Sequence, residues 1–255
     1  MAQGPGKVEQ VTPAERIQAV ERSPFYAIAD LAAKRKDCLY LHLGEPDFET
    51  PSHIVRAARE ALSGGWTHYT PDRGLADLRR LVAEKIRKEN QAEYNFEDEI
   101  LITAGGQAAL HTAIMGTINP GDEVLLLAPF YPPYLANVQL AGGTPVVVPM
   151  KSEEDFNPNP ALIEDHVTKK TKALILHSPN NPAGSVYREE ILAQLVRLAE
   201  RRDFLIISDE VYEKFIYGEH PHWSPAAFPN AKERVILTNS FSKTYAMTGW
   251  RVGNI

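Results

Sequence analysis

Short, almost wholly apolar runs alternate with longer runs of helical periodicity through most of this chain. The apolar runs occupy 99–103, 122–128, 144–150, 172–178, 204–210 and 234–240, and the helical patterns occupy 52–62, 75–86 and 189–202. Strands that are apolar throughout are buried on both faces, as happens when helices cover both sides of a mainly parallel sheet. The pattern therefore predicts an α/β fold in which the sheet is the middle of three layers.

The N-terminal part of the chain has a less regular pattern. Thr12 is followed by a proline and, three positions on, by a glutamate, which is typical of a helix N-terminus. Residues 24–36 form a second amphipathic segment, and the run 38–43 predicts a short strand that leads into a turn at 44–51.

Charge and cysteine content restrict the partners and the compartment. The net charge is −6, with acids and bases interspersed, so no basic stripe could follow a nucleic-acid backbone. A single cysteine, Cys38, excludes an internal disulfide, and a lone cysteine is usually a small buried residue. The sequence also shows neither a secretory signal nor an apolar run of membrane-spanning length. We therefore expect a cytoplasmic protein without nucleic-acid or membrane partners.

Polar residues follow several of the predicted strands, at the edge where parallel sheets bind ligands. Gly105 and Gly106 precede a predicted helix, where backbone N–H groups can close on an anion, although such pairs are more often simple turns. Asn181 lies between prolines, either in a polar turn or as an amide held rigidly at the sheet edge. Asp209 ends a buried run, so we expect it to face a cation or to cap the next helix.

The densest polar cluster follows the last apolar run. Ser240, Ser242 and Arg251 offer two hydroxyls and a fork-shaped permanent cation, which are the donors that a phosphate dianion needs. Lys243 stands among them. It is either a solvated surface lysine, the usual situation of that residue type, or a lysine that forms a Schiff base.

Taken together, these motifs resemble the class I aminotransferases, enzymes of fold type I that depend on pyridoxal 5′-phosphate. The resemblance rests on "LGEPDF", "YTPDRGLADLR", "TAGGQAAL", "PFYPPY", "SPNNPAG", "SDEVY" and "SFSKTYAMTGWRVG", in the family's order. It covers nearly all of the chain from about Leu41, and the joint spacing of the motifs makes chance a poor explanation.

The resemblance implies a role for each residue around the cofactor ring. Lys243 corresponds to the lysine that bonds to the cofactor aldehyde and later moves the proton at the substrate α-carbon. Asp209 would pair with the pyridine nitrogen and keep it protonated. Tyr212 and Asn181 would hydrogen-bond the phenolic oxygen, and Tyr131 would stack on the ring.

The resemblance also implies a phosphate cup, a substrate contact and an oligomer. The cup would comprise Gly105, Gly106, Gln107, Ser240, Ser242 and Arg251. Tyr69 corresponds to a tyrosine that reaches the phosphate of the neighbouring subunit, which implies a homodimer. Gly44 would meet the substrate carboxylate through its backbone, and Asn181 would also contact substrate. No metal is implied.

In this family the chain continues through an antiparallel strand, a long helix and most of a small domain. We therefore expect residues 1–45 to belong to the small domain and residues 46–255 to form a large cofactor-binding domain that is incomplete at its C-terminal end. The last strand would then leave a ragged buried edge. The arginine that grips the substrate α-carboxylate would be missing, and the 255-residue chain alone would be inactive.

The expected function is amino-group transfer between an L-amino acid and a 2-oxo acid. Gln107 is neutral, so nothing in its loop favours a second carboxylate, and strict preference for aspartate is not supported. Because the motifs specify the cofactor rather than the reaction, a carbon–sulfur lyase, a synthase or a decarboxylase stays open. So does a non-catalytic module, either a cofactor-sensing regulator domain or an inactive truncated form. A nucleotide-binding Rossmann domain fits less well, because "AGGQAAL" lacks the G-x-G-x-x-G spacing.

Overall fold

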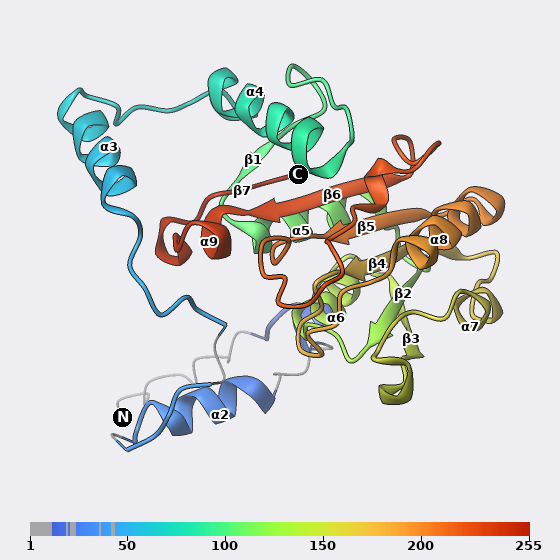
Figure 1. Cartoon of the computed structure of the whole chain (residues 1–255). Helices are drawn as coiled ribbons and strands as arrows, with labels where there is room; N and C mark the ends of the chain where they lie inside the picture. Colours follow the sequence, from blue (N-terminus) through green and yellow to red (C-terminus); the bar gives the residue numbers. More distant parts are fainter. Residues whose placement is uncertain (1–11, 19, 21–23, 36, 42–43) are drawn as a thin grey trace, which may run out of the picture.

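The computed structural model describes residues 12–18, 20, 24–35, 37–41 and 44–255 (Figure 1). The α-helices are α1 (Glu15–Gln18), α2 (Pro24–Ala32), α3 (Ser52–Ser63), α4 (Ala76–Lys85), α5 (Gly106–Thr117), α6 (Pro133–Leu140), α7 (Pro160–Asp165), α8 (Glu189–Arg202) and α9 (Phe241–Thr244). The strands are β1 (Ile102–Thr103), β2 (Glu123–Ala128), β3 (Thr144–Pro149), β4 (Thr171–His177), β5 (Leu205–Asp209), β6 (Val235–Ser240) and β7 (Gly253–Asn254). A π-helical turn, Ile86–Asn90, extends α4, and short 3-10 turns lie at Ser152–Glu154, Pro225–Ala227 and Thr248–Trp250.

The strands form one sheet of seven in the order β1-β7-β6-β5-β4-β2-β3. All neighbours from β6 to β3 are parallel, whereas β7 pairs antiparallel with both β1 and β6. The predicted mainly parallel, mixed sheet is thus confirmed. Every parallel strand ends its run at the same edge, which is where the predicted polar residues gather.

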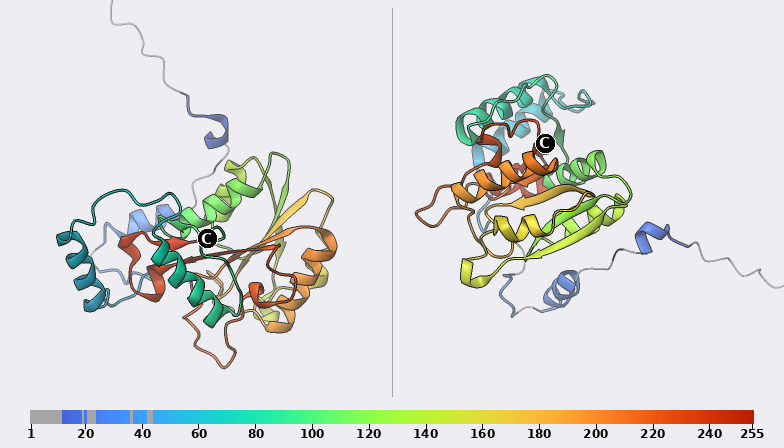
Figure 2. Two further views of the ribbon diagram at one scale, coloured as in Figure 1. Left: turned by 90° about the horizontal axis from the view of Figure 1, so that it is seen from above. Right: turned by 90° about the vertical axis from the view of Figure 1, so that its right-hand side faces the viewer.

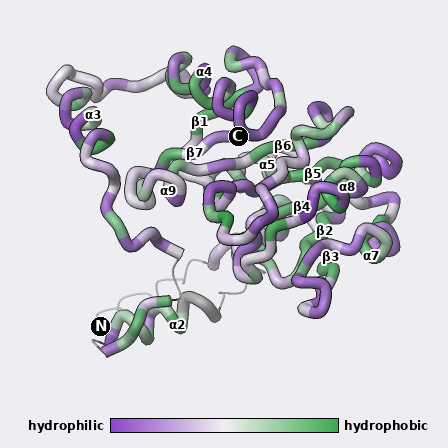
Figure 3. The backbone as a smooth tube through the Cα atoms, viewed as in Figure 1, coloured by the Kyte–Doolittle hydropathy of each residue, from purple (hydrophilic) through white to green (hydrophobic). Residues whose placement is uncertain are grey.

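Helices cover both faces of this sheet, as the views in Figure 2 show. On one face, side chains of α4, α7 and α8 pack on alternate strand residues such as Leu125, Leu174 and Ile206. On the other face, α5 and α6 pack on the intervening residues such as Leu126 and Ile175. Figure 3 shows hydrophobic stretches in the strands and hydrophilic residues along α7 and α8. Burial of both sheet faces explains why these strands are apolar throughout.

Helix bounds largely follow the sequence pattern. The helical patterns at 52–62, 75–86 and 189–202 correspond to α3, α4 and α8, and the segment at 24–36 corresponds to α2. The first helix does not begin at Thr12, because α1 starts at Glu15 and runs for only four residues, none of them buried. Without a packed face, the capping pattern alone did not extend the helix.

Two further sequence expectations are wrong. Residues 38–41 form no strand, since they have no sheet neighbour among the described residues, and 42–43 lie outside the described residues. The last strand does not leave an open edge. β7 lies inside the sheet, and Leu101 exchanges two backbone hydrogen bonds with Ile255, of 2.9 and 3.0 Å. Because β7 pairs with β1 on one side and with β6 on the other, its backbone has a neighbouring strand on both sides.

Candidate active site

A cavity of about 730 Å³ opens at the carboxyl ends of β4, β5 and β6, beside the start of α5. Its lining includes the predicted residues Gly44, Gly106, Gln107, Tyr131, Asn181, Asp209, Tyr212, Ser240, Ser242, Lys243 and Arg251. The residues come from segments that are far apart in the sequence, and the sheet brings them together because its parallel strands end at one edge.

One wall of the cavity is rich in hydrogen-bond donors. Ser240 and Ser242 are buried, with their Oγ atoms 2.9 Å apart, and Arg251 Nη1 lies 3.4 Å from Ser242 Oγ. The first turn of α5, at Gly106 and Gln107, adds N–H groups that have no acceptor within the helix. Two hydroxyls, a guanidinium and a helix N-terminus together make a site for a dianion.

Gly105 lies directly beneath the guanidinium. It has a φ of +85°, and a Cβ added there would lie 2.4 Å from Arg251 Nη2. Arg251 itself adopts a left-handed backbone conformation, with φ +54°, and its Nη1 donates to the backbone oxygen of Thr248 at 2.7 Å. Only a glycine lets the backbone turn here and lets the arginine pass so close.

Lys243 extends into the cavity from α9, one position after Ser242. Its Nζ donates to the backbone oxygen of Gly44 and lies 5.9 Å from the ring centroid of Tyr212. Burial lowers the pKa of the Lys243 amine, the Glu45 carboxylate raises it, and the Arg251 guanidinium lowers it, with a net lowering. A lowered pKa leaves more of the amine neutral near pH 7, and the neutral form is the one that acts as a nucleophile or takes up a proton.

Asp209 lies on the cavity floor and is 5% exposed. Its Oδ2 accepts a hydrogen bond of 2.7 Å from Tyr134 Oη, and its Oδ1 accepts one of 3.2 Å from the Val211 N–H. Among the described residues Asp209 pairs with no cationic side chain, and it caps a turn rather than a helix. A buried carboxylate without a cation is costly, which suits a position that a charged ligand completes.

Tyr131, His177 and Tyr212 line the rest of the cavity, and the buried Tyr134 contacts two of them. Tyr131 and Tyr134 meet edge to face, with centroids 5.5 Å apart. His177 stacks on Tyr212, with centroids 5.8 Å apart, and is the register partner of Asp209 in the sheet. Burial lowers the pKa of the His177 imidazole, which Asp209 only partly opposes, so the ring is neutral near pH 7.

Sequence reasoning missed Tyr134 and His177. Position was the only sequence signal for either residue, since His177 lies one residue before the end of the predicted strand 172–178 and Tyr134 follows Tyr131 at helical spacing. His177 Nε2 is buried and has no hydrogen-bond partner among the described residues. A buried polar atom of this kind has a hydrogen bond still to make, which a ligand or a water molecule in the cavity can supply.

Of the other residues that the sequence singled out, Tyr69 and Cys38 lie outside the cavity, whereas Gly44 lies at it. Tyr69 does not line the cavity but stands fully exposed in the segment between α3 and α4. Gly44 does lie at the cavity, where an added Cβ would come within 2.8 Å of Tyr212 Oη. Cys38 is exposed and free, so the expectation that it would be buried is wrong.

A buried polar network adjoins Ser240 at the end of β6. The sequence pattern did not predict this network either. Glu213 Oε1 accepts from Asn239 Nδ2 at 2.9 Å and pairs with Lys85, while Asn90 Nδ2 donates to Glu213 at 3.0 Å and to Glu210 at 2.9 Å. Asn239 Oδ1 in turn accepts from the Ser240 N–H at 2.7 Å. Each oxygen of the two carboxylates has a donor, counting Ser208, Ser224 and His222 on Glu210. The network therefore positions the end of β6 rather than offering open metal ligands.

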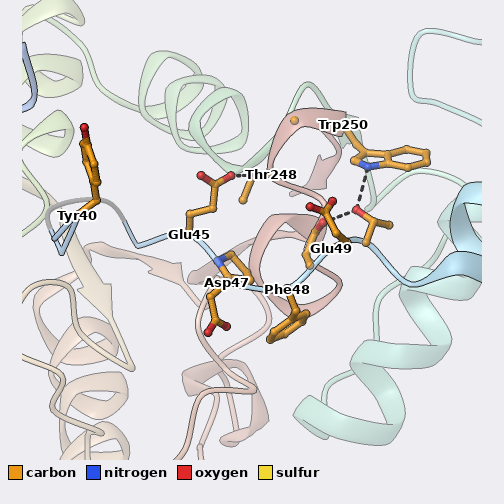
Figure 4. Close-up of a pocket in the computed structure, with 11 residues that line it drawn as sticks. Tyr40, Glu45, Asp47, Phe48, Glu49, Thr248 and Trp250 are labelled. Atoms are coloured by element: carbon orange, nitrogen blue, oxygen red, sulfur yellow. Dashed lines mark hydrogen bonds between the residues drawn. The ribbon is translucent and has the colours of Figure 1, made fainter. Parts of the chain in front are cut away.

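A second cavity, of about 770 Å³, adjoins the first and shares Thr248 with it (Figure 4). Glu45, Asp47 and Glu49 line it together with the aromatic rings of Tyr40, Phe48 and Trp250. Thr248 donates to Glu45, and Trp250 Nε1 donates to Thr50 at 3.1 Å. These contacts hold the segment 44–50 against the loop that follows Lys243.

The residue profile of the family described as aminotransferase class I and II matches residues 36–255 of this chain. An aspartate aminotransferase of Pyrococcus abyssi is 44% identical over 239 residues, which are 94% of this chain and 61% of that protein. A probable aspartate/prephenate aminotransferase of Thermus aquaticus is 44% identical over 243 residues, covering 94% of this chain and 62% of the relative. The chain thus spans less than two thirds of the length of these relatives.

A solved structure agrees with these sequence comparisons. The Thermus thermophilus aspartate aminotransferase with maleate superposes with a TM-score of 0.92 at 41% identity, over 96% of this chain and 64% of that one. In the part of this chain that the structure describes, no helix combines the length and hydrophobicity needed to cross a bilayer.

Proposed function

This chain belongs to the aminotransferase class I and II family, and from that premise we propose that it moves an amino group between an L-amino acid and a 2-oxo acid with pyridoxal 5′-phosphate. The observation that carries the proposal is the cavity in which a lysine amine, a cation-free buried carboxylate and a dianion site face one another. Those are the three groups that an aldehyde, a ring nitrogen and a phosphate require.

The residues around the cavity fit this cofactor. Ser240, Ser242 and Arg251, with the N–H groups that start α5, would hold the phosphate. Asp209 would hold the ring nitrogen, because its carboxylate has no cation among the described residues. Tyr131 would cover one ring face, and Tyr212 and Asn181 would meet the phenolic oxygen, as their places on the cavity wall allow. When bound, the cofactor supplies a ring that accepts the electron pair left by the departing α-proton.

The chain's own groups would handle the proton. Lys243 Nζ would take the proton from the substrate α-carbon and later return one, which requires its neutral form. Burial favours that form by lowering the pKa of the amine. Asp209 would keep the ring nitrogen protonated throughout, because a buried carboxylate stabilises a neighbouring positive charge strongly.

We also propose a cytoplasmic homodimer in which residues 1–45 belong to a small domain and residues 46–255 to a large one. The free, exposed Cys38 is consistent with a reducing compartment. Tyr69 is fully exposed and so available to a second subunit's phosphate site. The 255-residue chain alone would transaminate negligibly, and assay beside a form extended to the relatives' full length tests this.

The proposal is tested by trapping the cofactor. The full-length protein, meaning the form extended to the length of the relatives, is reduced with borohydride in the presence of pyridoxal 5′-phosphate. This should fix the cofactor on Lys243, as peptide mass spectrometry would show. Lys243→Ala is the matched control and should give no adduct. An adduct on another lysine would refute the assignment of Lys243.

A second test separates transamination from the lyase, synthase and decarboxylase reactions. Products are analysed with and without a 2-oxo acid. The amino donors are aspartate, which appears in the names of the relatives, and a neutral amino acid. Turnover should require the 2-oxo acid.

Asp209→Ala should slow the half-reaction by about 100-fold or more, since the ring loses its electron-accepting protonation. Near-wild-type half-reaction rates would contradict the role of Asp209.

A further inference from the structure

The hydroxyl of Tyr134 is the feature of this site that no packing argument explains. Tyr134 lies in the first turn of α6, is 1% exposed and packs in the core with residues of α5 and the sheet, where a phenylalanine would fill nearly the same volume. A buried hydroxyl costs free energy unless it is hydrogen-bonded. Its partner is Oδ2 of Asp209, at 2.7 Å.

Tyr134 is also tied to Tyr131, the residue proposed to cover one face of the cofactor ring. Its N–H donates to the backbone oxygen of Tyr131 at 3.1 Å, and the two rings meet at 81°. On its other side it meets His177 edge to face, with centroids 5.8 Å apart. One rigid aromatic residue thus connects Tyr131, Asp209 and His177, which belong to three different segments.

The contact is well suited to a carboxylate that must stay charged and correctly turned. Burial, and next the Asp209 carboxylate, raise the pKa of the Tyr134 phenol well above its usual value, so the hydroxyl remains a donor. The other contact to Asp209 is the Val211 N–H at 3.2 Å, which reaches Oδ1. With one donor on each oxygen, the carboxylate cannot rotate freely about its Cβ–Cγ bond.

We propose that Tyr134 is a positioning residue that fixes the orientation in which Asp209 meets the ring nitrogen of the cofactor. The inference rests on the proposed function. Tyr134 touches neither the cofactor nor the substrate in this role, and it acts through Asp209 alone. Tyr134 also sets the distance between Asp209 and Tyr131, so that the Asp209 carboxylate and the Tyr131 ring can both contact the same bound cofactor ring.

A double-mutant cycle on cofactor affinity tests the proposal. The dissociation constant of pyridoxal 5′-phosphate is measured by absorbance titration of full-length protein for wild type, Tyr134→Phe, Asp209→Ala and the double variant. Tyr134→Phe loses a hydrogen bond to a charged group, which should raise the dissociation constant about 10-fold. In the Asp209→Ala background the same change should have an effect of less than about two-fold. A packing role would weaken affinity equally in both backgrounds and would overturn the proposal.

Tyr94→Phe is the matched control, because its hydroxyl is bound to the Val235 backbone oxygen at 3.4 Å, remote from the cavity. It should leave the affinity unchanged.

A second cycle uses the cofactor-free protein and urea unfolding. Tyr134→Phe should lower the free energy of unfolding more when Asp209 is present than in the Asp209→Ala background. Equal losses in the two backgrounds would show that the hydrogen bond between Tyr134 and Asp209 does not contribute. If no form binds pyridoxal 5′-phosphate, the proposed function fails, and the proposed role of Tyr134 fails with it, while the unfolding cycle still reports on the contact. If Asp209→Ala weakens binding and Tyr134→Phe does not, this inference alone fails.

Discussion

Lys243 is governed by its immediate neighbours at the scale of single residues. Burial lowers the pKa of its amine, and two charged side chains act in opposite directions, with Glu45 raising it and Arg251 lowering it. Glu45 is held near the site by Thr248, while Lys243 itself is bound to the Gly44 backbone oxygen. The acceptor that holds the amine and the carboxylate that raises its pKa therefore both come from the segment before α3, which the sequence motif of Lys243 does not include.

The first prediction concerns the charge of Glu45. Glu45→Gln removes the carboxylate that raises the pKa of Lys243, so that pKa should fall further and the neutral amine should be more abundant at pH 8. Acylation of Lys243 in cofactor-free protein, followed by mass spectrometry across pH, should be roughly two- to ten-fold faster at pH 8. Asp47→Asn, in the same loop, is the control and should leave the rate profile in place. An unchanged profile for Glu45→Gln would show that Glu45 does not control the amine.

At the scale of elements, the site depends on how closely α5 and the end of the chain approach each other. Gly105 precedes α5 with φ +85°, beneath Arg251, and a Cβ at Gly253 in β7 would lie 2.6 Å from the Gly105 carbonyl carbon. β7 in turn pairs with β1 and β6. Strand pairing, helix start and guanidinium therefore form one tightly packed unit.

The second prediction tests this approach. Gly105→Ala introduces a side chain at a positive φ and against the guanidinium, so it should destabilise the protein by about 1 to 3 kcal/mol and weaken cofactor binding. Gly116→Ala, in α5 with no atom within 4 Å of its added Cβ, should instead stabilise by about 0.5 to 1 kcal/mol. Urea unfolding and a binding titration measure both. Equal effects of the two substitutions would contradict the close packing described.

The third prediction concerns the network that supports β6 from α4. Burial raises the pKa of Glu213, but Lys85 and the Asn90 and Asn239 amides more than offset it, so the pKa is lowered overall. Lys85→Met should cost roughly 2 to 4 kcal/mol of stability at pH 7, because it leaves a buried charge without its cation. A lowered carboxyl pKa stabilises the fold above the unfolded value of 4.5, and this contribution is lost as pH falls through the folded value. The difference between variant and wild type should therefore shrink below about pH 4.5.

Unfolding curves at several pH values measure this difference. Lys232→Met removes an exposed ion pair with Glu99 and should cost less than about 1 kcal/mol. A loss of that small size for Lys85→Met would mean that the buried pair contributes little.

At the scale of the whole molecule, α3 and the segment after it stand apart from the sheet (Figure 1). None of the 12 residues of α3 is buried, although the helix is amphipathic. Leu62 and Trp66 are exposed by 63% and 68%, and Tyr69 is fully exposed. An apolar face with no covering in the described part of the chain supports the proposed dimer.

The fourth prediction follows from that face. Trp66→Glu should shift the full-length protein from dimer to monomer in analytical ultracentrifugation, since a charge is costly at the centre of an apolar interface. Tyr217→Glu, at another fully open aromatic residue, is the control and should leave the mass unchanged. A dimer that persists in Trp66→Glu would place the interface elsewhere.

Much of this protein follows from local pattern. Apolar runs became β2 to β6 because strands buried on both faces must be apolar throughout, and α8 occupies the residues that its period marks, 189–202. The residues at the strand ends, from Asp209 to Lys243, could be named as candidates because parallel strands end at one edge. Local pattern was therefore enough to predict the layered fold and most of the residues around the cavity.

The contacts between distant segments could not be predicted in this way, because they depend on how the chain folds. Neither the hydrogen bond from Tyr134 to Asp209 nor the stacking of His177 on Tyr212 has a local signature, since each joins residues 35 or more positions apart. The same is true of β7, whose place between β1 and β6 replaced the predicted open edge. Residues 38–41 had the pattern of a strand but have no neighbour to pair with among the described residues. A strand is stable only when another strand satisfies its backbone, and a buried polar group only when a partner reaches it, so both depend on the folded neighbourhood.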